Sequence, residues 1–173
     1  MISIVSGPTC VGKTYFLENK NNRLLELSNL PPTTVSYATG SINTNHLEFP
    51  DVVSHWIKRY DGRDIVDQIV SIHYNLVTGV HRSLLINAYK NNDDYFSKNV
   101  IILGVSYSEY KVRIGQRHGS LSIPTGNRSQ QLLDVYKDWI NDLNKNEIPY
   151  KFVEAIGDYK VLEEEEFFRM LND

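Results

Sequence analysis

The chain has 173 residues, enough for one compact domain that buries a substantial core. Its hydrophobic content of 41% and charged content of 23% are ordinary for a globular protein, and no apolar run approaches the ~20 residues that a membrane span needs. The net charge of −3 gives no overall basic field that would attract nucleic acid. The single cysteine allows no intrachain disulfide, which suits the cytoplasm. We therefore expect a cytoplasmic protein, and the lack of a long apolar run places it outside any membrane.

The first predicted element is a short strand that leads through a glycine-containing loop into a helix. Residues 2–6 are mainly apolar and β-branched, and a helix is expected to continue from residue 15. Between them, residues 7–14 read GPTCVGKT and fit the phosphate-binding pattern G-x-x-x-x-G-K-[ST]. A loop in this place points successive backbone N–H groups at one spot, so we expect it to bind polyphosphate.

The lysine, threonine and glycines of this loop each suit a particular task in binding phosphate. Lys13 can reach the β- and γ-phosphates of a nucleotide as a point charge, and the Thr14 hydroxyl can bind Mg²⁺. Gly7 and Gly12 allow backbone angles or a close approach that a Cβ would hinder. The predicted cofactor-binding residues are Gly7, Pro8, Thr9, Cys10, Val11, Gly12, Lys13 and Thr14.

Strands and helices alternate along the rest of the chain. Runs of β-branched, aromatic and apolar residues predict four further strands, at 33–37, 69–74, 100–105 and 150–153. Apolar residues at helical spacing predict helices at 51–60, 82–89, 129–143 and 161–171, and Ser108 is predicted to cap another that runs through Arg117. This order predicts a single α/β domain over residues 1–173, with helices on both faces of a five-stranded, mainly parallel sheet.

Two arginines follow the fourth predicted strand. Arg113 and Arg117 lie four residues apart, so a helix places both guanidinium groups on the same face. Ligands of parallel sheets bind at the carboxyl ends of the strands, where the phosphate loop also lies. Phosphoryl transfer spreads negative charge over the moving group, and two such cations could stabilise it as catalytic residues. The alternative for this pair is an ordinary solvated helix face.

With these features the chain resembles the P-loop kinases of nucleosides and nucleotides. The matching residues are GPTCVGKT at 7–14 and VRIGQR at 112–117, in the place of the lid of that family, at about 107–128. The resemblance implies a three-layer α/β/α P-loop NTPase fold, ATP with Mg²⁺ as cofactors, and a mobile lid that closes over the nucleotide. It also implies that the protein is a kinase acting on a nucleoside, a nucleotide or a nucleic-acid hydroxyl or phosphate.

The metal and acceptor regions depart from that family. Its members usually carry an acidic residue at the end of the third strand, where this chain has His73 and Asn75. If the acceptor is a hydroxyl, a carboxylate can act as general base, and Asp51 is favoured slightly over Glu48. The segment that holds them is loosely similar to the Glu-Pro…Trp segment of deoxynucleoside kinases, which makes Trp56 a candidate for stacking on a base. Asp51 could also simply cap a helix.

Other functions remain compatible with the same loop. A nucleotide-dependent regulatory NTPase would use it for switching, and the opening GPTCVGKT also resembles the GPTxxGKT of isopentenyl transferases, which hold pyrophosphate there. A kinase of nucleic-acid ends would need a basic groove that reaches the site. The candidates for such a groove are Lys58, Arg59, Arg63 and Arg82.

Overall fold

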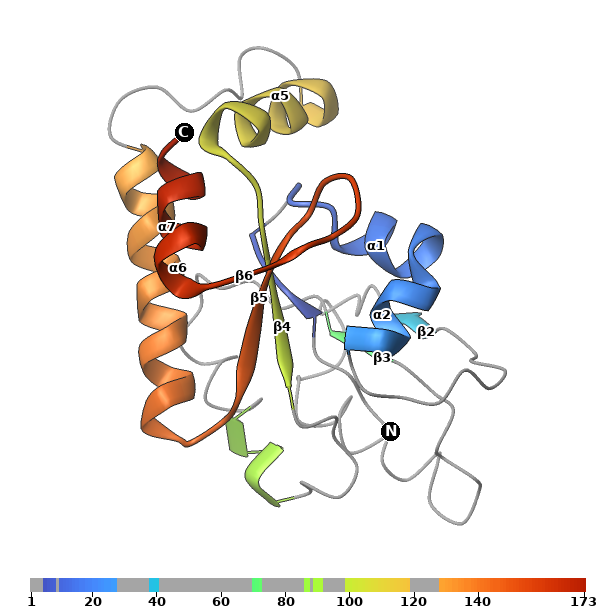
Figure 1. Ribbon diagram of the computed structural model, residues 1–173, viewed down its shortest axis with the longest axis vertical. Helices are drawn as coiled ribbons and strands as arrows, with labels where there is room; N and C mark the ends of the chain where they lie inside the picture. The colour runs from blue at the N-terminus through green and yellow to red at the C-terminus, as the bar shows by residue number, and fades with distance from the viewer. Residues whose placement is uncertain are drawn as a thin grey trace.

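The described part of the protein is built around a four-stranded sheet with helices on both faces (Figure 1). The computed structural model describes residues 5–8, 10–27, 38–40, 70–72, 86–87, 89–91, 99–118 and 128–173. The strand order in the sheet is β1-β4-β5-β6. β1 (Val5–Ser6), β4 (Val100–Gly104) and β5 (Tyr150–Glu154) run parallel, and β6 (Val161–Leu162) is antiparallel to β5.

A second pair of parallel strands is formed by β2 (Ala38–Gly40) and β3 (Val70–Ile72), and β3 lies close to β1. The predicted α/β class and the mainly parallel pairing are therefore confirmed, with four strands in the sheet that contains β1. β2 begins just after the strand predicted at 33–37, which lies outside the described residues, and β3 lies within the strand predicted at 69–74.

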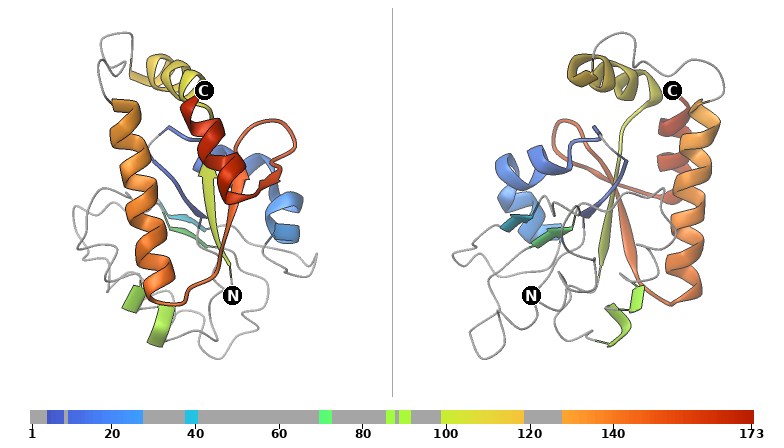
Figure 2. Two further views of the ribbon diagram at one scale, coloured as in Figure 1. Left: turned by 60° about the vertical axis from the view of Figure 1, so that its left-hand side comes forward. Right: turned by 180° about the vertical axis from the view of Figure 1, so that it is seen from behind.

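The helices are arranged in layers on the two faces of the sheet, as the views in Figure 2 show. α1 and α2 lie on one face and α6 and α7 on the other, while α5 follows β4 at the carboxyl end of that strand. None of the helices in the described ranges is both long and apolar enough to span a bilayer. The helices are α1 (Lys13–Asn19), α2 (Asn21–Leu27), α5 (Tyr107–His118), α6 (Arg128–Lys145) and α7 (Glu164–Asn172).

β4 is the centre of the core because all five of its residues are buried. Ile101 and Leu103 belong to the cluster that includes Phe16 of α1. Polar groups of α6 are bonded into the sheet: the Tyr136 hydroxyl donates to the Leu103 carbonyl at 2.6 Å, and burial raises its pKa well above the usual value. The Trp139 indole N–H donates to the Ser6 hydroxyl oxygen at 3.0 Å, which fixes the end of β1 where the phosphate loop begins.

Two of the predicted boundaries were wrong for local reasons. Ser106, two residues before Ser108, caps α5, because the Glu109 N–H donates to the Ser106 hydroxyl oxygen at 3.2 Å. Residues 161–162 form β6 rather than the start of the last helix: Leu162 is buried opposite Phe152 while its neighbour is exposed, which is strand alternation. α7 then begins with three glutamates in its first turn, where the helix dipole favours negative charge.

Candidate functional site

The predicted phosphate loop, residues 7–14 and called the phosphate loop below, follows β1 and runs into α1, and its two glycines are required by the backbone. A Cβ on Gly7 would lie 2.7 Å from the Val11 side chain and 3.0 Å from the Leu103 carbonyl oxygen, so only glycine lets the loop approach β4 this closely. Gly12 has a φ of 105° and is the N-cap of α1, and its carbonyl accepts the Phe16 N–H at 2.9 Å. The prediction that a Cβ would hinder the loop at both positions is confirmed.

A tight turn forms the middle of the loop. The Val11 N–H donates to the Pro8 carbonyl at 3.3 Å, and Cys10 has a φ of 69°, which is rarely adopted by residues other than glycine. The Val11 side chain is buried in the hydrophobic core, and this packing holds the turn against the rest of the protein. Thr9 lies outside the described residues, and of Thr14 the structure describes only the backbone, within α1.

Lys13 is the buried cation of the loop. Its Nζ donates to the Gly7 carbonyl at 2.7 Å and to the Pro8 carbonyl at 2.9 Å, and the residue is 9% exposed. Burial lowers the pKa of Lys13 to about 8; the nearby Cys10 thiol acts in the opposite direction and the positive charge of Arg117 acts in the same direction. An anion placed in this loop would compete with two neutral carbonyls for the ammonium and would stabilise its charged form.

α5 brings both predicted arginines to the loop, but their surroundings differ. Arg113 donates from Nη1 to the Val11 carbonyl at 2.6 Å and from Nη2 to the Ala155 carbonyl at 2.8 Å. Its Nε donates to Glu109 at 2.8 Å. Arg117, one turn further along, is exposed and makes no hydrogen bond or ion pair with any residue that the structure describes. Its positive charge contributes to the lowered pKa of Lys13.

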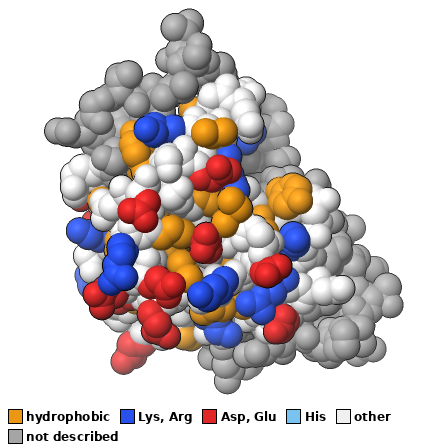
Figure 3. Space-filling model, turned by 45° about the horizontal axis from the view of Figure 1, so that its top comes forward, with side chains coloured by type: hydrophobic (Ala, Val, Ile, Leu, Met, Phe, Trp, Pro, Cys, Tyr) orange, Lys and Arg blue, Asp and Glu red, His pale blue; other side chains and the backbone are white. Residues whose placement is uncertain are grey.

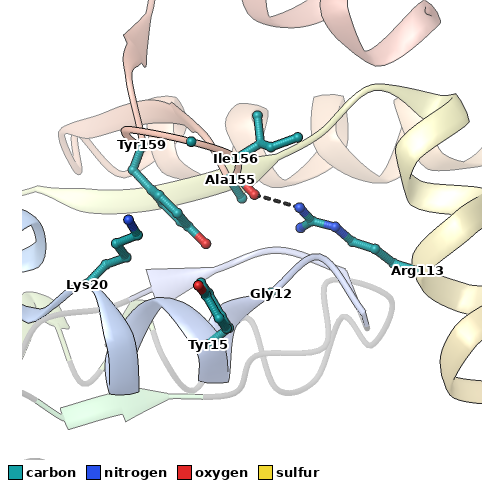
Figure 4. A pocket seen from close by; sticks show the side chains of 8 residues that line it. Gly12, Tyr15, Lys20, Arg113, Ala155, Ile156 and Tyr159 are labelled. Carbon is teal, nitrogen blue, oxygen red and sulfur yellow. Dashed lines mark hydrogen bonds between the residues drawn. The ribbon is translucent and has the colours of Figure 1, made fainter.

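A pocket of about 460 Å³ adjoins the loop through Gly12 (Figure 4). α1 and its carboxyl end form one wall, and the turn between β5 and β6 forms the other. In Figure 4, Arg113 and Lys20 stand at opposite ends, and Tyr159 points its hydroxyl into the space above Tyr15. The lining residues are Gly12, Tyr15, Lys20, Arg113, Ala155, Ile156, Gly157 and Tyr159.

The pocket has an aromatic and apolar interior. The Tyr159 ring stacks on Phe16 at 4.7 Å between centroids and 5° between planes, and the Lys20 ammonium lies 6.0 Å from the centre of the Tyr159 ring. Tyr15 and Ile156 are partly exposed to solvent, at 55% and 46%. A space of this size with aromatic walls and cationic ends suits a ligand that has a flat ring and an anionic tail.

The described surface in Figure 3 mixes acidic, basic and apolar side chains across one face. Interspersed charges of both signs attract a long polyanion less than a single-signed face does. The residues proposed for a basic groove, at 58, 59, 63 and 82, lie outside the described part of the chain.

Sequence reasoning identified the loop but missed the pocket. The turn after the fifth strand was not assigned to the site, although the carboxyl end of β5 lies on the same edge of the sheet as the phosphate loop. The sequence feature that could have identified this turn is the glycine at position 157, between Ala155 and Tyr159, because glycine is typical of turns. The other predicted site residues, Glu48, Asp51, Trp56, His73 and Asn75, lie outside the described residues.

Comparison with known proteins assigns the chain to no family: no protein-family model matches it, and no curated protein matches it in sequence.

Proposed function

We propose that the protein is a phosphotransferase that uses ATP with Mg²⁺ and acts on a nucleoside, a nucleotide or a nucleic-acid hydroxyl or phosphate. One observation carries the proposal: the buried ammonium of Lys13 lies in a G-x-x-x-x-G-K-[ST] loop that opens through Gly12 onto a pocket of about 460 Å³. A phosphate tail in the loop and a base in the adjoining pocket fit the two parts of a nucleotide.

The phosphate end of the ligand would be held by the loop. Lys13 would exchange its bonds to two neutral carbonyls for stronger, charge-assisted bonds to phosphate oxygens, which gives a net gain because the ammonium is already removed from water. Thr14 is the residue that would hold Mg²⁺, which when bound neutralises charge on the phosphates. The base would lie against the ring of Tyr15 and the side chain of Ile156.

The transferred group would be stabilised by Arg117. This guanidinium is exposed on α5, and its positive charge acts on the pKa of Lys13, so it is the proposed cation for the transferred charge. If the acceptor is a hydroxyl, Asp51 is the proposed general base. If the acceptor is a phosphate, no base is needed.

The arrangement of strands supports the same proposal. Because β3 lies close to β1 and pairs with β2, joining the two sheets would give the order β2-β3-β1-β4-β5-β6. If β3 also runs parallel to β1, that sheet would have the five parallel strands that the resemblance implies for a three-layer P-loop NTPase fold. α5 would then form the first part of a lid over about 107–128.

Calorimetry with MgATP, followed by product analysis, tests the proposal. The parent protein should bind ATP and transfer label from its γ-phosphate to at least one nucleoside, nucleotide, DNA or RNA acceptor. Lys13→Ala should abolish transfer with an unchanged circular dichroism spectrum, and Lys145→Ala, on the exposed end of α6, is the matched control. Release of free phosphate alone would indicate a regulatory NTPase, and release of pyrophosphate only when a prenyl diphosphate is added would indicate a transferase of the isopentenyl type. No binding of any nucleoside triphosphate by folded protein would refute the proposal.

A further inference from the structure

One guanidinium connects the two walls of the candidate site. Arg113 donates to the Val11 carbonyl of the phosphate loop at 2.6 Å and to the Ala155 carbonyl of the turn after β5 at 2.8 Å. A third bond, from Nε to Glu109 at 2.8 Å, fixes the side chain on its own helix. The guanidinium lies directly against the loop, because a Cβ on Gly12 would be 3.1 Å from Nη1.

This geometry sets the spacing between the loop and the pocket wall. The guanidinium group is planar and rigid, so its two terminal nitrogens hold the Val11 and Ala155 carbonyls at a fixed separation. The Val11 carbonyl lies in the loop after β1 and the Ala155 carbonyl in the turn after β5, and both strands pair with β4. Arg113 adds a second connection between the two segments, beyond the ends of the strands. The side chain is only 21% exposed, so water competes weakly for these bonds.

We infer that Arg113 is a positioning residue: it keeps the pocket proposed for the base at a fixed distance from the phosphate loop. This inference depends on the proposed function. A nucleotide that occupies both places at once gains affinity because its two parts are linked at the right distance. That gain requires the loop and the turn to keep their relative positions. Arg113 therefore matters most for ligands that reach from one to the other.

The test compares three ligands: ATP, tripolyphosphate, which can occupy only the loop, and adenosine, which can occupy only the pocket. Arg113→Met should weaken ATP binding about tenfold or more, while the affinities for tripolyphosphate and adenosine each change by less than about threefold. Arg169→Met is the matched control, because Arg169 makes the same kind of i,i+4 pair, with Glu165, on the surface of α7. Calorimetry measures the two phosphates, and ligand-observed NMR measures adenosine.

The variant Arg113→Lys distinguishes the effect of the bridge on ATP affinity from the effect of the positive charge. A lysine keeps the positive charge but its ammonium cannot span both carbonyls, so the selective loss of ATP affinity should persist in this variant. Recovery of ATP binding by Arg113→Lys, or an equal loss for all three ligands in Arg113→Met, would overturn the inference and leave the proposed function intact. Failure of the parent protein to bind any of the three ligands would instead overturn the proposed function. Thermal melting of each variant confirms that it folds.

Discussion

Changing Lys13 to methionine should remove a buried charge that the fold accommodates at a cost. Burial lowers the pKa of Lys13 from 10.5 to about 8, and a shift of that size corresponds to roughly 3 kcal/mol against the charged form. Methionine has a similar length and no charge. The substitution also gives up two hydrogen bonds to the Gly7 and Pro8 carbonyls, each worth about 1 kcal/mol. At neutral pH the variant should therefore be slightly more stable than the parent.

The sign of the pH dependence follows from the direction of the shift. Between about pH 8 and pH 10.5, the unfolded chain holds a proton on Lys13 that the folded protein has released. The unfolding free energy of the parent therefore rises with pH across this window, and below about pH 8 the cost of the charge is fully present. Between about pH 7.5 and about pH 9.5, the parent should gain about 2 kcal/mol relative to Lys13→Met.

Urea denaturation of both proteins at these two pH values measures the difference. Both proteins carry Cys10→Ser, because the Cys10 thiol acts on the pKa of Lys13 and its own titration would not cancel. The remaining groups that titrate in this range are common to the two proteins, so their contributions cancel. Lys145→Met, which removes an exposed lysine from α6, controls for the loss of a lysine side chain and should follow the parent. Parallel pH profiles for the parent and Lys13→Met would show that the ammonium is hydrated, and the reasoning about the loop would then be wrong.

Three further changes test the site and the core. Arg117→Ala should lower kcat for phosphoryl transfer at least tenfold with little change in ATP affinity, because the side chain would act on the transferred charge; an unchanged kcat would remove Arg117 from the mechanism. Tyr15→Ala should weaken ATP binding several-fold through loss of base stacking and leave tripolyphosphate binding unchanged, and calorimetry would show an equal loss for both if the base lies elsewhere. Gly104→Ala should destabilise the fold by about 1–3 kcal/mol, because the new Cβ would lie 2.5 Å from the Phe167 ring, and an unchanged urea midpoint would contradict this packing.

The phosphate loop could be predicted because its constraints are local. Two glycines and a lysine at fixed spacing specify a backbone path within a few residues, and the structure gives Gly12 the positive φ that this path requires. β4 could be predicted for a similar reason, since a continuous apolar run of this length has to be buried on both faces. Neither required knowledge of the tertiary structure.

The pocket and the different surroundings of the two arginines could not be predicted in this way. The sequence places Arg113 and Arg117 on the same face of one helix and gives no reason to distinguish them. Arg113 bridges two segments because the Val11 and Ala155 carbonyls lie within its reach. Arg117 has no hydrogen-bond partner among the described residues. β6 was missed because two residues carry too little pattern to be distinguished from the start of a helix. Its pairing with β5 is what makes residues 161–162 extended.

Backbone strain in the described residues also points to the candidate site. Three residues other than glycine have positive φ: Cys10 at 69°, Tyr159 at 53° and Glu147 at 56°. Glu147 is explained by helix termination, because the N–H groups of Glu147 and Ile148 donate back to the carbonyls of Asn144 and Leu143, which is the Schellman arrangement at the end of α6.

The other two residues with positive φ belong to tight turns at the candidate site: the Val11 N–H donates to the Pro8 carbonyl across Cys10, and the Tyr159 N–H donates to the Ile156 carbonyl. Cys10 lies in the phosphate loop, and Tyr159 lines the adjoining pocket on the opposite wall. Positive φ at a residue other than glycine costs about 1–3 kcal/mol, and it persists where the surrounding structure holds the backbone in place. Together with the buried charge of Lys13, these two residues place three unfavourable terms of the described structure in the loop and the pocket that adjoins it, which supports the proposed binding site.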